Sequence, residues 1–94
     1  MKTEHIVAEL EEAVRRLGYE VRHEQGRFQG GRCTVNGEAL IVLNRRHPPE
    51  AQLAVLAESL RDLPIGNIFL RPAVREAVEA LWSSGRDDDA SHAG

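Results

Sequence analysis

The sequence predicts an α+β domain. Its sheet is expected to be a mainly antiparallel meander of three strands, with a fourth left open, packed with three helices in the order α-β-β-β-α-(β)-α. Apolar residues recur at helical spacing near both ends of the chain, the segment between them alternates as strands do, and an Asn-Gly pair marks a hairpin. With 94 residues, of which 41% are apolar, the chain has the size of one domain, which we place at residues 1–82.

The first helix is predicted from about Glu4 to Leu17. Thr3 is a plausible N-cap, and Gly18 suits the position after the last turn. One apolar stripe follows the helical period and consists of Ile6, Val7, Leu10, Val14 and Leu17. This stripe is the face that we expect to be buried.

Three strands are predicted next. Residues 19–24 alternate between apolar and charged side chains, a second strand covers about 28–35, and Asn36-Gly37 fits a type I′ turn into a third strand over 38–44. A two-residue turn fixes the register, which sets Cys33 opposite Leu40 and on the same face as Val42. We therefore expect Cys33 to be a small core residue. The apolar run at 39–43 indicates a strand that is covered on both faces.

The remaining elements are mostly helical. Pro49 fits the first position of a helix that runs to about Asp62, and Pro72 begins a last helix that runs to about Trp82. Residues 65–70 fit either a short fourth strand or a tight connection. Residues 83–94, with three consecutive aspartates, are expected to form a disordered acidic tail.

Composition excludes several classes of protein. The net charge is −3, and no stretch approaches the roughly 18 apolar residues of a membrane span, so no membrane association is expected. Cys33 is the only cysteine, which excludes an internal disulfide. The N-terminus lacks the apolar core of a signal peptide, which predicts a cytoplasmic location.

The first candidate site is a basic set on the predicted strands and loops, and it consists of Arg22, Arg27, Arg32, Arg45 and Arg46. Arginine forks bind phosphate and carboxylate groups, so this set predicts an anion- or nucleic-acid-binding edge. The alternative is a solvated edge strand that is kept charged against aggregation. Nucleic acid is disfavoured because few aromatic residues accompany the arginines and the chain is not basic overall.

The second candidate site is an interface formed by Phe69, Arg71, Arg75 and Trp82, because aromatic residues and arginine are enriched at interface cores. The alternative for Trp82 is a lid over the core. No catalytic residues, metal ligands or cofactor are expected. The histidines lack metal-ligand spacing, and no serine sits at a turn between a strand and a helix.

Two resemblances accompany these patterns. Residues 28–33, 40–44, 56–60 and 71–76 resemble a group of small uncharacterised bacterial proteins, which implies no activity. A strand that ends in Asn, a short loop and a helix reading Ala-x-x-Leu are similar to the active-site entry of the gluzincin-like repressor-cleaving metallopeptidases. Where their helix carries His-Glu-x-x-His, this chain reads Glu58-Ser59-Leu60-Arg61-Asp62. The zinc ligands and the catalytic Glu are absent, so zinc proteolysis does not carry over.

These observations favour a small non-enzymatic protein-interaction domain whose partner is a second copy of the chain or an unknown protein. The alternative is an anion- or nucleic-acid-binding module that uses the basic set.

Overall fold

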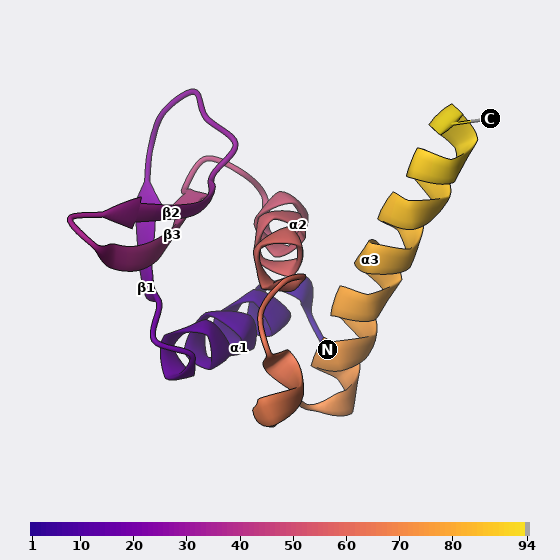
Figure 1. The fold of residues 1–94 in the computed structure, drawn as a ribbon, viewed down its shortest axis with the longest axis horizontal. Coiled ribbons are helices and arrows are strands. Elements are labelled where there is room, and N and C mark those ends of the chain that lie inside the picture. Colours follow the sequence, from indigo (N-terminus) through magenta and orange to yellow (C-terminus); the bar gives the residue numbers. More distant parts are fainter. Residues whose placement is uncertain (94) are drawn as a thin grey trace.

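A computed structural model describes the backbone of residues 1–93 and the side chains of residues 1–84 (Figure 1). The elements are α1 (Thr3–Arg16), β1 (Glu20–Glu24), β2 (Gly31–Val35), β3 (Glu38–Asn44), α2 (Pro49–Leu60), the 3₁₀ turn η1 (Ile65–Asn67) and α3 (Pro72–Ala93). The predicted α+β class is confirmed. Residues 65–70 add no strand, because they form η1 and an extended connection.

The sheet is mixed, and the predicted meander is wrong. Its strand order is β1-β3-β2, with β1 parallel to β3 and β2 antiparallel to β3. The connection at 25–30 crosses the end of β3 to reach its far side. Strands lie about 4.8 Å apart, so this crossing spans roughly 10 Å, which six residues reach with ease.

A buried asparagine at the end of β3 secures this crossing. The side-chain nitrogen of Asn44 donates hydrogen bonds to the carbonyl oxygens of Gly26 at 2.8 Å and Phe28 at 2.7 Å. The backbone N–H of Arg45 donates to the carbonyl of Glu24 at 2.7 Å. These contacts hold both ends of the crossing to the carboxyl end of β3.

The β2–β3 hairpin has the predicted register. Val35 pairs with Glu38, Cys33 with Leu40 and Gly31 with Val42. Asn36 and Gly37 have φ values of 52° and 82°, as a type I′ turn requires. The turn chemistry alone is sufficient to fix this pairing.

Helices cover only one face of the sheet. α1 and α2 pack against it, and α3 lies beyond them against α2 and α1 (Figure 1). Among the described residues, helices therefore cover β3 on one face and not on both, although Leu40 on the other face is only 2% exposed. Ile41 and Leu43 point into the core, whereas Cys33 on the opposite face is exposed. Cys33 is not a core residue, because no helix remains to cover its face.

The core lies between the helices and this one sheet face, and its largest fully buried side chains include Leu10, Leu56, Leu60, Val74 and Val78.

The predicted N-cap of α1 is displaced by one residue. Lys2 is the N-cap and makes no side-chain cap hydrogen bond, and Thr3 is already helical.

The last helix continues to Ala93, past its predicted end near Trp82. The expected acidic tail falls mainly on residues 85–94, whose side chains lie outside the described part of the structure. No helix within residues 1–93 combines the length and apolar character needed to cross a membrane.

Candidate functional site

Strand β2 forms one edge of the sheet, and its outer side has no neighbouring strand among the described residues. The I′ turn closes with a hydrogen-bonded pair, Val35 and Glu38. Hydrogen-bonded and non-hydrogen-bonded pairs alternate along an antiparallel ladder, so Cys33 also bonds to β3. The backbone N–H and C=O groups of Arg32 and Thr34 therefore point outward from the edge. They are available to an added strand.

The open face next to this edge carries exposed apolar atoms. Val35 is 44% exposed, Cys33 is exposed and Val42 is half-buried. Beside them is a shallow hollow of about 510 Å³. Its lining consists of Glu24, Phe28, Gln29, Gly30, Gly31, Arg32, Cys33 and Val42. The same strand thus carries a protruding valine at one end and a hollow at the other.

A cleft of about 600 Å³ separates β2 from α2 on the helix side. Arg32 and Asp62 form an ion pair of 3.7 Å across it. The hydroxyl of Ser59 donates to the carbonyl of Val55 at 2.8 Å, which is a bond within α2. The Ser59 hydroxyl is thus bonded within its own helix.

Gly30 is required by the backbone beside this cleft. Its φ is +92°, and a Cβ at this position would lie 2.5 Å from the carbonyl oxygen of Val42. A close approach of the chain to β3 therefore explains this glycine. Gly31 has open space around its Cβ position, although its φ of +143° also favours glycine.

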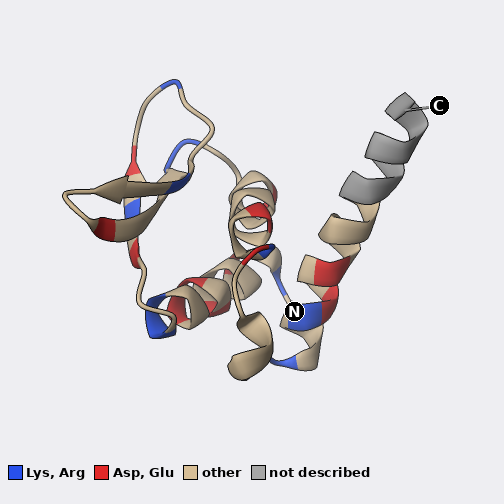
Figure 2. Cartoon of the chain, viewed as in Figure 1, with Lys and Arg blue, Asp and Glu red and all other residues tan. Residues whose placement is uncertain are grey.

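The five predicted basic residues are divided among β1, β2 and the loops that follow β1 and β3, and basic residues lie in several separate stretches of this region (Figure 2). Arg22 and Arg32 lie on strands at opposite edges of the sheet, and each has a carboxylate partner. The hydrogen bond from Arg22 to Glu20, 3.1 Å long, raises the pKa of Arg22. Arg45 donates to the carbonyl of His23 at 3.3 Å.

Arg27 and Arg46 are the two members of the set that the structure brings to one pocket. This pocket of about 450 Å³ lies at the carboxyl ends of the parallel strands β1 and β3, and Gln29 and His47 also line it. The Nδ1 atom of His47 is buried and has no hydrogen-bond partner among the described residues. A polar donor set of this kind could hold a small oxyanion.

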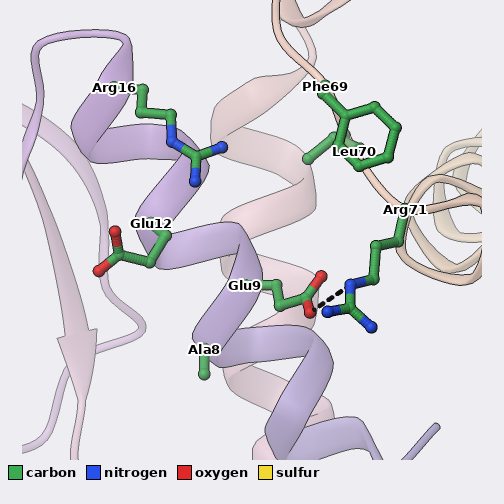
Figure 3. A pocket seen from close by; sticks show the side chains of 7 residues that line it. All are labelled: Ala8, Glu9, Glu12, Arg16, Phe69, Leu70 and Arg71. Carbon is green, nitrogen blue, oxygen red and sulfur yellow. Dashed lines mark ion pairs between the residues drawn. The ribbon is translucent and has the colours of Figure 1, made fainter.

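Two of the four predicted interface residues, Phe69 and Arg71, border a pocket beside α1 (Figure 3), whereas Trp82 packs against the core. Phe69 is 74% exposed, and Arg71 pairs with Glu9 of α1 at 2.9 Å. Both border a pocket of about 460 Å³ between α1 and residues 69–71. Trp82 packs against the core, and its Nε1–H donates to the carbonyl of Ala57 at 2.7 Å. Arg75 is half-buried on α3.

Comparisons with known protein families, with curated proteins and with solved structures found no match to this chain. Among the described residues, no group of three or more His, Cys, Asp and Glu side chains could hold a metal ion.

The open edge of β2 is the feature that sequence reasoning missed. One signal was present, because residues 31–34 contain no large apolar side chain. A strand that buries nothing large on either face is typical of a sheet edge. The predicted meander order places β2 in the centre of the sheet. The lack of large apolar side chains in β2 was therefore not interpreted as a sign of an edge strand.

Proposed function

We propose that this chain is a small non-enzymatic protein-interaction domain that associates with a second copy of itself. The observation that carries the proposal is the open edge of β2 beside an uncovered sheet face. Main-chain groups on an unpaired edge offer hydrogen bonds to another strand. Exposed apolar atoms next to them, such as those of Val35, add burial when that strand arrives.

The surface around Phe69 is the alternative contact in this proposal. An aromatic side chain that is 74% exposed contributes little to the monomer's own stability. Its neighbour Arg71 forms an ion pair with Glu9, so a charged pair lies beside the Phe69 ring. We retain Phe69, Arg71, Arg75 and Trp82 as the alternative interface.

Sedimentation of the full chain over a wide range of concentration tests the proposal. We expect a reversible dimer that persists at high salt, because main-chain hydrogen bonds and apolar contacts are screened little. Phe69→Ser is expected to leave the dimer intact if β2 is the interface, and to weaken it if the Phe69 surface is used. A chain that stays monomeric at every concentration would contradict self-association.

An oxyanion-binding module is the second candidate function. It is favoured by the pocket that Arg27, Arg46 and His47 line, and by the buried Nδ1 of His47, which has no hydrogen-bond partner among the described residues. Ligands of sheets with parallel strands commonly bind beyond the carboxyl ends of those strands. The ligand class would be a phosphate or a carboxylate, on a small molecule or on a nucleic acid backbone.

Calorimetric titration of the full chain with inorganic phosphate at low salt tests this candidate. The double substitution of Arg27 and Arg46 by Gln is expected to abolish binding. Arg22→Gln is the matched control, because Arg22 lies on β1 outside this pocket. Equal binding by all three proteins, or no binding by the unaltered chain, would dismiss the pocket.

A further inference from the structure

We infer that the second copy joins through β2 itself, in an antiparallel pairing whose two-fold axis passes between the two Cys33 residues. This inference rests on the proposed self-association and adds its surface, its symmetry and its register. In this register Cys33 faces Cys33 of the other copy, and Arg32 faces Thr34. The two three-stranded sheets then become one continuous sheet.

The hydrogen-bonding pattern of the edge selects this arrangement. The outward N–H and C=O groups belong to Arg32 and Thr34, which lie on either side of Cys33. A two-fold axis at Cys33 sets each of these residues opposite the other, so each N–H meets a C=O. Cys33 then forms a non-hydrogen-bonded pair with its counterpart.

The shape of the open face fits the same register. Gly31 and Val35 are equally distant from Cys33 along β2, so Val35 of each copy comes to lie opposite Gly31 of the other. Val35 protrudes, and the hollow lies beside Gly31. A Cβ at Gly31 would meet no atom within 4 Å, so the space that a valine side chain needs is open. The strand is therefore complementary to itself, as a two-fold interface requires.

The charges along the edge are compatible with this pairing. The two copies of Arg32 lie diagonally across the new contact, where like charges would repel. Each Arg32, however, has Asp62 of its own chain at 3.7 Å on the helix side. This partner reduces the repulsion.

Cysteine crosslinking of the full chain tests the register. The two Cys33 Cα atoms would lie about 4.5 Å apart, within the range of roughly 4.4–6.8 Å that a disulfide spans. Diamide takes two electrons and two protons from a pair of thiols to form the disulfide. We expect a covalent dimer to form rapidly at Cys33 and to disappear in Cys33→Ser.

The matched control moves the thiol by one residue, as Thr34→Cys in the Cys33→Ser background. In the inferred register its two thiols are diagonal neighbours, about 7–8 Å apart, so crosslinking should be about tenfold slower. The reverse order of rates would place the axis at residue 34 and would overturn the inferred register.

A second pair of variants tests the hydrogen bonds. Thr34→Pro removes an outward N–H, which an edge strand tolerates, and it should abolish the dimer. Thr34→Val keeps the N–H and should leave the dimer intact. Circular dichroism verifies that both variants fold, and the crosslinking test stands if the proline variant does not.

The outcomes separate this inference from the proposed function. A dimer that survives Thr34→Pro in folded protein, or that crosslinks no faster at Cys33 than at the control position, overturns the inference but leaves self-association in place. Loss of that dimer on Phe69→Ser would then assign the interface to the alternative surface. A chain that never dimerises overturns both.

Discussion

Replacing Asn44 by Ala should weaken the fold far more than a single polar substitution usually does. Asn44 is 2% exposed and makes three side-chain hydrogen bonds to backbone groups. Its amide nitrogen donates to Gly26 and Phe28, and its amide oxygen accepts from the N–H of Arg46 at 3.0 Å. Alanine removes all of these contacts and leaves the backbone groups around it without partners.

The expected cost follows from these contacts. Each hydrogen bond contributes about 0.5–1.5 kcal/mol net, and a buried group left without a partner costs more. The loop containing Gly26 and Phe28 is partly open to water, which limits that extra cost. The sum is about 3 kcal/mol, a large share of the 5–15 kcal/mol or so that stabilises a typical domain.

Urea unfolding followed by circular dichroism measures this cost. With a slope of about 1.5 kcal/mol per molar, a loss of about 3 kcal/mol lowers the midpoint by roughly 2 M. Asn67→Ala is the matched control, because Asn67 is exposed and makes no side-chain hydrogen bond among the described residues. It should cost less than about 0.5 kcal/mol. Equal midpoints for the two variants would refute the role of Asn44.

Two further predictions concern the close approach of Gly30 to the backbone of β3 and the hydrogen bond between α3 and α2. Gly30→Ala should cost about 3 kcal/mol, because it combines a positive φ with a close contact to the Val42 carbonyl. Gly66→Ala, at an open position, should leave stability unchanged or raise it by up to about 1 kcal/mol. Trp82→Phe should cost about 1–2 kcal/mol, because the buried carbonyl of Ala57 loses its donor. Thermal unfolding followed by circular dichroism measures all three, and a Trp82→Phe loss below about 0.5 kcal/mol would mean that this bond adds little.

Local chemistry explains which parts of the fold were predictable. The hairpin register depends only on Asn36, Gly37 and the alternation of the residues around them, and it was predicted correctly. The starts of α2 and α3 at Pro49 and Pro72 were also correct, since proline suits the first turn of a helix. Each of these features is decided within a few residues.

Strand order was not predictable in this way. β1 alternates between exposed and half-buried residues, and such a pattern fits either side of β3 equally well. In the structure, Asn44 hydrogen-bonds to the crossing loop, which precedes it by more than a dozen residues. The sequence indicated only that Asn44 ends a strand, and it did not indicate the contact with the preceding loop. A polar residue that closes an apolar strand is a useful signal for such a contact.

The grouping of the basic residues was not predictable for the same reason. The basic set was defined by its closeness along the chain, but the mixed order places Arg22 and Arg32 on opposite edges of the sheet. The crossing at 25–30 instead brings Arg27 beside Arg46. Distance along the chain therefore predicted the charge of the region but not which charges meet.

The uncovered face follows from where the helices pack. α1 and α2 both pack on the same side of the sheet, and α3 continues that helical layer by burying Val74 and Val78 with them. The helices thus complete the core without packing on the second face. The long apolar run of β3 was expected to be buried on both sides, and on the second face Leu40 is buried whereas Val42 remains half-buried. Pairing of two β2 edges would continue the hydrogen-bonded sheet beyond β2, its edge strand in the monomer. It would also place Val35 of one copy beside Gly31 and Val42 of the other. The feature that refuted the predicted core position of Cys33 is thus the feature that makes Cys33 the best reporter of assembly.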